Sequence, residues 1–269
     1  MKFGLSLLIL GFAATFSSAG LFITAGLVAA PSSLLAATKL TPKTTPSSRD
    51  KRTSVVLPQL PPGSAPGGRR YGGATRGQCP NVTPPLTALV PSTLDSSSVR
   101  NVWGLTAREY PKLWFYLPYT KNSSIQAEFT VLDDESKDPI YTSAIALPTK
   151  PSTIGVSLPH NIPPLQVGKK YRWFLNFYCD PQKQSVPIFV EGVIIRKNPD
   201  AALVGELQKA QPLQQVAIYA SNGFWHDALT TLAELRQKSP QNEIFEKEWT
   251  NLLQAIGLGE VANRPLASN

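Results

Sequence analysis

The chain of 269 residues has little of the chemistry on which most enzymes depend. Its two histidines, His160 and His226, are far apart and have no Cys, Asp or Glu at metal-ligand spacing. No loop ends in Gly-Lys-Ser/Thr to bind phosphate, and no Gly-x-Ser-x-Gly elbow presents a serine nucleophile. These absences predict a protein that is not an enzyme and binds no metal or other cofactor. His226, beside Asp227 near the start of a predicted helix, is expected to be solvated.

The densest group of acidic residues also lacks the pattern of a metal site. Asp133, Asp134, Glu135 and Asp138 lie in DDESKD, which has neither the glycine nor the alternating ligand order of a calcium-binding loop. The segment lies between two predicted strands. We therefore expect a solvated hairpin turn.

The N-terminal residues have a composition typical of export. A single basic residue, Lys2, precedes an uncharged and mostly apolar run, which predicts a signal peptide over residues 1–37. Two groups of small residues, ending at Ala19 and Ala37, are candidate cleavage sites. Residues 3–30 are also long enough to cross a bilayer, which takes about 20 apolar residues, so a retained inner-membrane anchor is the alternative. We expect an exported protein of the periplasm or cell envelope.

Negative charge is nearly missing from one part of the chain. The net charge is +8, but residues 38–78 contain eight Lys or Arg and one acidic residue, Asp50. From Cys79 to the end, 17 basic residues balance 17 acidic ones. Residues 38–66 are also rich in Pro, Ser and Thr, which predicts a disordered basic linker that could contact anionic lipid or wall polymers. No nucleic-acid partner is expected, because an exported chain meets little nucleic acid.

The chain has two cysteines, Cys79 and Cys179, and both follow the predicted signal peptide. This arrangement predicts one disulfide, formed in an oxidising compartment. The alternative is a pair of unrelated buried thiols. A bridge between them would close a loop of about a hundred residues and stabilise the fold by up to roughly 4–5 kcal/mol.

Short apolar runs alternate with turn residues from residue 86 to residue 196. Ile154, Val156 and Leu158 recur at every second position, a period typical of strands with one buried face. The pattern predicts a mainly β fold, with a β-sandwich domain over residues 67–198. Seven strands are predicted, at residues 86–91, 113–119, 127–134, 140–148, 153–159, 171–179 and 188–196. Residues 99–104 form either an eighth strand or an irregular crossing.

Three residues refine this prediction. Leu165, Gly168 and Tyr171 have the spacing of a tyrosine corner, in which a Tyr hydroxyl contacts the backbone a few residues upstream. A long aromatic strand, YRWFLNFYC, begins at this Tyr. The same succession occurs at the E-to-F connection of immunoglobulin-like and fibronectin-type-III-like sandwiches, so we expect a sandwich of that kind.

After Lys197 the apolar residues change to helical spacing. Residues 199–258 predict a small helical tail, and residues 259–269 a flexible C-terminus. Six residues occupy the signature positions of one tetratricopeptide helix pair: Tyr219, Gly223, Trp225, Ala228, Leu232 and Pro240. Because a free-standing solenoid needs about three such repeats, the tail should pack on the sandwich.

The segment GGRRYGGATRGQCP, residues 67–80, has the most unusual composition. Its glycines would allow tight turns where the chain enters the sandwich, with Arg69, Arg70 and Arg76 on the surface. The alternative is that these arginines contact anionic lipid or wall polymers.

Aromatic residues at alternating positions should lie on the outer sides of the sheets. They are Trp114, Tyr116, Phe174 and Tyr178. With the three arginines they form a candidate interaction surface for a sugar or a peptide. The alternative, which we favour, is that the helical tail covers the aromatic residues.

Seven segments carry a resemblance to a known family. In order they are GRRYGGATRGQCP, LTALVP, the aromatic run ending in YLPY, LQVGKKYRW, CDPQ, FVEG and YASNGFWHDALTTLAELRQKSP. They resemble a cyanobacterial family known as domain of unknown function 928, over roughly residues 62–258. The resemblance implies an exported envelope protein, and it assigns no mechanism and no functional residue.

Two functions are compatible with these observations. We expect a non-catalytic interaction module that binds another envelope protein. The alternative is a wall- or glycan-associated binding domain that uses the basic arm, residues 38–78, and exposed aromatic residues.

Overall fold

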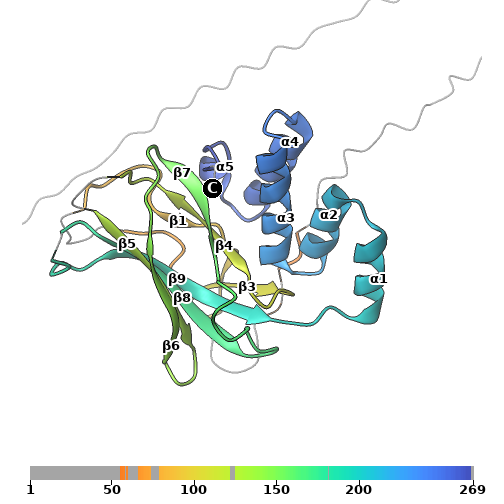
Figure 1. Cartoon of the computed structure of the whole chain (residues 1–269), viewed down its shortest axis with the longest axis horizontal. Coiled ribbons are helices and arrows are strands. Elements are labelled where there is room, and N and C mark those ends of the chain that lie inside the picture. The colour runs from red at the N-terminus through yellow and green to blue at the C-terminus, as the bar shows by residue number, and fades with distance from the viewer. Residues whose placement is uncertain are drawn as a thin grey trace, which may run out of the picture. The chain divides into compact units, whose positions relative to one another are not determined.

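Within the described residues, apolar side chains at alternating positions build two sheets, and those at helical spacing build five helices (Figure 1). The computed structural model describes residues 55–57, 59, 66–73, 79–121, 125–180 and 182–267. All of them belong to the compact unit Arg49–Asn269. The predicted signal peptide, and nearly all of the predicted linker, lie outside the described residues.

The larger sheet has six strands in the order β2-β3-β9-β8-β5-β6. Neighbouring strands are antiparallel except β3 and β9, which are parallel. The strands are β2 (Ser92–Leu94), β3 (Arg100–Thr106), β5 (Gln126–Asp133), β6 (Pro139–Ile145), β8 (Lys170–Tyr178) and β9 (Ile188–Arg196).

The smaller sheet has three antiparallel strands in the order β1-β4-β7. They are β1 (Thr87–Ala88), β4 (Lys112–Leu117) and β7 (Ser152–Ser157). β6 and β7 are consecutive in the chain but belong to different sheets, and each ends its sheet's order. The connection between them, residues 146–151, therefore passes from one sheet to the other.

The mainly β class with a helical C-terminal part is confirmed. Each of the seven predicted runs overlaps a strand, and residues 100–104 belong to a regular strand, β3, and not to an irregular crossing. The short strand β2 was not predicted, because its three residues, STL, contain a single apolar side chain. The parallel pairing of β3 with β9 was not predicted either.

The two sheets face each other across a hydrophobic core. On β8, Trp173, Leu175 and Phe177 are buried, as the period of two predicted. Phe115 of β4 packs edge-on against Trp173 and Phe129, with ring centroids 5.5 and 5.8 Å apart. Burying one such side chain stabilises the fold by roughly 1.5–3 kcal/mol, so these rings account for much of the attraction between the sheets.

The predicted disulfide between Cys79 and Cys179 is present. Cys79 is buried in the core, and Cys179 directly follows β8. The two cysteines are 100 residues apart in sequence. The bridge therefore fastens the start of the sandwich to the end of a strand that has neighbours on both sides.

The connection into β8 contains the contact expected from the tyrosine spacing. The hydroxyl of Tyr171 accepts a hydrogen bond from the backbone N–H of Gln166 at 3.0 Å. Leu165 is buried beside it, and Gly168 has φ of +80°, which a residue with a side chain rarely adopts. These three positions fix the turn that brings the chain into β8.

The helical part contains α1 (Ala201–Lys209), α2 (Pro212–Ser221), α3 (Trp225–Lys238), α4 (Glu243–Ala255) and α5 (Gly259–Ala262). Asp200 caps α1 by accepting from the N–H of Leu203 at 2.8 Å, and Asn242 caps α4. Gly223, with φ of +78°, allows the sharp turn between α2 and α3. Of the six tetratricopeptide-like positions, Trp225, Ala228 and Leu232 are fully buried.

The helices cover the outer face of the smaller sheet, as we favoured. Trp114 is 1% exposed and Tyr116 is 2% exposed, so neither belongs to an interaction surface. The indole N–H of Trp114 donates to the hydroxyl of Thr230 at 3.0 Å, and its ring meets that of Trp249 edge-on. The same helices cover part of the larger sheet, where Leu203 of α1 packs against β3 and β9.

Two terminal segments are more ordered than predicted. Residues 259–267 are not a flexible C-terminus: they contain α5, and Leu266 pairs in parallel with Thr153 of β7. Residues 55–57, assigned to the disordered linker, lie against α2, where the N–H of Val56 donates to the carbonyl of Ala220 at 3.0 Å. In both segments apolar residues contact the helical part, which local composition does not indicate.

Candidate functional site

The glycine-rich segment is an entry segment that connects the two sheets. Arg69 pairs with Glu191 of β9, and the N–H of Gly72 donates to the carbonyl of Leu86 at 2.7 Å. A Cβ on Gly68 would lie 2.8 Å from the carbonyl oxygen of Glu191, and one on Gly72 would lie 2.7 Å from a methyl of Ile188. Glycine is therefore needed here because the backbone packs too closely for a side chain.

The arginines of this segment do not form one surface patch. Arg70 is 7% exposed, contrary to the prediction, and its Nη1 donates to the carbonyl of Ile256 at 2.7 Å, just after α4. A guanidinium at the C-terminus of a helix is stabilised by the unpaired carbonyls there. Arg69 is exposed and lies over the ring of Phe189 at 4.6 Å, and Arg76 lies outside the described residues.

We favoured burial of all four outward aromatic residues under the helical tail, but on the outer face of the larger sheet the helices leave Phe174 and Tyr178 uncovered. Phe174 and Tyr178 of β8 are half-buried, and Phe189 of β9 joins them. Lys183 lies over the ring of Tyr178 at 4.6 Å, and partial burial raises the pKa of that phenol. Phe189 was missed, although the alternation in IFVEGVIIR predicts its outward position.

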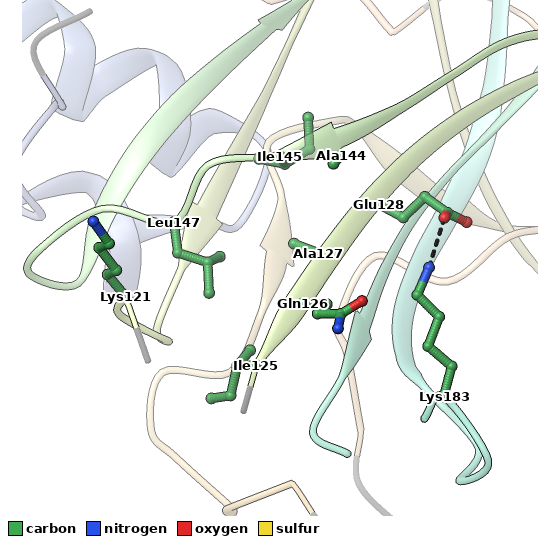
Figure 2. A pocket seen from close by; sticks show the side chains of 9 residues that line it. All are labelled: Lys121, Ile125, Gln126, Ala127, Glu128, Ala144, Ile145, Leu147 and Lys183. Atoms are coloured by element: carbon green, nitrogen blue, oxygen red, sulfur yellow. Dashed lines mark hydrogen bonds and ion pairs between the residues drawn. The ribbon is translucent and has the colours of Figure 1, made fainter. Parts of the chain in front are cut away.

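A pocket of about 300 Å³ lies around the N-terminal end of β5 (Figure 2). Ile125 and Leu147 lie on one side of the strand, and the ion pair between Glu128 and Lys183, at 2.9 Å, lies on the other. The ion pair raises the pKa of Lys183, chiefly through its hydrogen bond to Glu128. Lys121 and Gln126 also line the pocket, which therefore offers mixed polar and apolar contact area.

A larger groove of about 730 Å³ lies between the end of β6 and the edge of β7. On the side of the larger sheet its walls include Ile145, the last residue of β6, and Leu147. On the other side they include Ile154 and Val156 of β7. The C-terminal residues Leu266 and Ala267 line it as well. This groove was not predicted from the sequence, because it depends on which two strands end the sheets.

The acidic segment forms the predicted hairpin turn, but it is not simply solvated. Asp133 is buried, accepts from the N–H groups of Glu135 and Ser136, and forms an ion pair with Lys169. The hydrogen bond from Lys169 is the main reason why the pKa of Asp133 is lowered. Asp134 pairs with Arg172 at 2.8 Å. These carboxylates therefore stabilise the turn.

His226 is buried and not solvated, which corrects the prediction. It is 2% exposed and packs against Gly104 of β3, where a Cβ would lie 2.8 Å from its Nε2. The neighbouring Asp227 accepts from the N–H of Ala107 at 2.9 Å and faces Arg108 at 3.4 Å. Burial lowers the pKa of His226 to about 3 and raises the pKa of Asp227 to about 6. The pair joins α3 to the end of β3.

In the part of the chain that the structure describes, no group of three or more His, Cys, Asp or Glu residues is arranged to hold a metal ion. No helix in those residues has the length and apolar character needed to cross a membrane. His160 instead packs against the ring of Tyr110, with centroids 4.3 Å apart.

Comparison with solved structures and curated proteins adds little to this geometry. The neutron crystallographic structure of a Jonesia denitrificans lytic polysaccharide monooxygenase is similar over 38% of this chain, with 13% sequence identity and a TM-score of 0.26. The chain spans 63% of that protein, less than two thirds of its length. No curated protein matches the sequence.

The family comparison covers most of the described fold. The model of the family described as Domain of Unknown Function (DUF928) matches residues 71–266. The match begins in the entry segment and ends beside β7, so it includes the sheets and the helical part together. This chain therefore belongs to the Domain of Unknown Function (DUF928) family.

Proposed function

We propose that this protein is an exported, non-catalytic cell-envelope protein that binds another envelope protein through the groove beside β7. The observation that carries the proposal is that the chain's own residues 265–267 already pair along part of this edge. An edge that accepts one extended segment has the geometry to accept another. The disulfide and the N-terminal apolar run favour export, because disulfides persist in oxidising compartments.

The helical part is a weaker candidate for the binding surface. Residues 225–233, the first nine of α3, are all buried, because α3 is packed between the sheets and the other helices. A helix pair that binds a partner must leave one face free. The immunoglobulin-like sandwich and the tetratricopeptide-like helix pair remain proposals about this fold, and neither is needed for the binding mode.

Rebinding of the purified full chain to isolated envelopes tests this function. Pretreating the envelopes with a protease should abolish retention of the chain, because the partner is a protein. Pretreatment with a glycan hydrolase should leave retention unchanged. The opposite pattern would contradict a protein partner and support the second candidate.

The second candidate is a glycan-binding domain, and one observation favours it. Phe174, Tyr178 and Phe189 stay on an outer sheet face that the described helices do not cover, with Arg69 beside them. Rings on a sheet face can stack against sugars. Phe174→Ala and Phe189→Ala should then lower retention on wall polysaccharide, while Trp114, which is buried, makes no contribution. Anionic lipid or wall polymer bound by the basic residues before position 55 is a further proposed partner.

A further inference from the structure

We propose that Gly155 and Ser157, at the free edge of β7, form a strand-addition site for an extended acidic segment of a partner protein. This inference rests on the proposed function, because it specifies how the groove binds its partner. In strand addition, backbone hydrogen bonds hold an extended peptide against a sheet edge, and pockets beside the edge take alternate side chains.

The direction of the backbone groups on β7 supports a free edge. The N–H of Thr153 donates to the carbonyl of Pro265, and its own carbonyl accepts from Ala267, both at 2.8 Å. Residues two apart in a strand point these groups to the same side. Gly155 and Ser157 therefore point theirs to the side that residues 265–267 occupy at Thr153. No described backbone group beyond the ladder with β4 pairs with them.

The pairing of β4 gives the same result independently. The carbonyl of Trp114 accepts from the N–H of Leu89, so its backbone groups face β1 and not β7. Its neighbour Phe115 must then face β7, and it lies opposite Ile154. The backbone groups of Ile154 therefore hydrogen-bond to β4, whereas those of Gly155, which lies opposite Trp114, face away from β4.

The groove supplies the side-chain pockets that this binding mode requires. Its floor and walls are apolar at Ile145, Leu147, Ile154 and Val156, and Leu266 bounds it at the occupied end. An extended segment places every second side chain on the same face. A partner segment with apolar residues at alternate positions would therefore fill the groove while its backbone pairs with the edge.

The charges at the groove indicate the chemistry of the partner. Lys150 is exposed and is the one charged residue among those that line the groove; no acidic residue lines it. Lys112 lies beside Gly155 on the outer side of the strand. An acidic segment complements these ammonium groups. The basic residues 38–54 of this chain would be repelled by them, so the occupant comes from another protein.

Binding of synthetic peptides to the full, oxidised chain tests the inference. The probe is a capped eight-residue peptide in which valine alternates with glutamate, compared with its valine–lysine counterpart by fluorescence anisotropy at low salt. The acidic peptide should bind at least about tenfold more tightly. Lys150→Glu should weaken its binding several-fold, whereas Lys209→Glu, the same charge change on α1, should leave binding unchanged.

Ser157→Pro is the decisive variant, because it removes an outward N–H and keeps the ladder with β4. It should weaken binding of the acidic peptide about tenfold. Ser157→Ala, which keeps the N–H, should bind the peptide as tightly as the parent chain does. In the parent chain, bound peptide should slow hydrogen exchange at the amides of Gly155 and Ser157. Equal binding by the two Ser157 variants, unprotected amides, or no peptide binding would overturn strand addition. Protease-sensitive envelope retention would in that case still support the proposed function.

Discussion

The outer faces of the two sheets begin from the same pattern and end in different environments. Trp114 and Tyr116 alternate along β4 as Phe174 and Tyr178 alternate along β8. The helices bury the first pair almost completely, whereas the second pair stays half-buried. Strand periodicity identifies which residues leave the core between the sheets. What covers those residues is decided by segments more than a hundred positions away.

The covered face also explains why the helical part is not a separate domain. The indole N–H of Trp225 donates to the carbonyl of Leu89 at 2.7 Å, and Trp114 reaches Thr230. Each hydrogen bond satisfies a buried polar group that would otherwise destabilise the fold. The smaller sheet and the helices therefore stabilise each other, while the larger sheet, which the helices cover only in part, relies mainly on the core between the sheets and on the disulfide.

The largest expected effect tests this difference directly. Trp114→Ala should lower the free energy of unfolding by about 3–5 kcal/mol, because it leaves a cavity between β4 and the helices. Phe174→Ala should cost about 1 kcal/mol or less, since its ring is only partly removed from water. Urea denaturation of both variants measures the contrast. Equal costs would mean that the two faces are covered alike.

The next effect concerns the larger sheet. Replacing both Cys79 and Cys179 with alanine should lower the free energy of unfolding by about 2–4 kcal/mol, because the unfolded chain regains the freedom of a long loop. Thiol labelling of the denatured parent should find no reactive cysteine until reductant is added. An unchanged denaturation midpoint in the double variant would show that the sheet does not depend on the bridge.

A smaller effect, visible as pH dependence, concerns the buried pair that joins α3 to β3. The pKa of His226 falls from 6.5 to about 3, so its contribution to stability is lost as pH falls through that range. The pKa of Asp227 rises from 3.8 to about 6, so its contribution is regained as pH falls from about 6 to about 4. In the parent chain these two contributions oppose each other.

Variants of the pair separate the two contributions. On acidification from pH 6 to pH 4, His226→Gln should gain stability relative to Asp227→Asn, by about 2 kcal/mol or more. Asparagine at 227 keeps an oxygen that accepts from the N–H of Ala107, so this variant does not also lose that hydrogen bond. Parallel stability–pH curves for the two variants would show that the groups are not buried as described.

The smallest expected effect on stability concerns the basic arm. Deleting residues 38–54 removes five basic residues and Asp50, and it keeps Val55 and Val56 beside α2. The shortened chain should melt like the parent. Its retention on anionic vesicles should fall, and the retention of the parent should weaken with salt, since exposed charges are screened within about 10 Å at 0.1 M. Salt-independent and equal retention would exclude this role for the arm.

Sequence patterns predicted the features that depend on neighbours in the chain. The contact between Tyr171 and Gln166 spans five residues, and the inward face of β8 follows from alternation alone. The burial of Arg70 was not predictable in this way, because its partner Ile256 lies 186 residues away. His226 was expected in water for the same reason: Gly104, the residue that makes room for it, lies on a distant strand.

The groove beside β7 also depends on residues that are distant in the chain, so it was not predictable from local sequence patterns. Residues 140–148 and 153–159 were both predicted as strands, yet no residue pattern in either segment indicates that the strand lies at the edge of its sheet. Edge position follows from the order of all nine described strands and from the pairing of Leu266 with Thr153. The groove could therefore be identified only once the strands were assembled.

Site-specific photo-crosslinking in intact cells tests the central claim most directly. The crosslinking residue is placed in the full chain at Ser157, in the groove, or at Phe174, on the open outer face. A partner protein held at the edge of β7 predicts a discrete protein adduct from position 157 and none from position 174. A protein adduct from position 174 alone would contradict the account, because the partner would then bind the open sheet face and not the free strand edge.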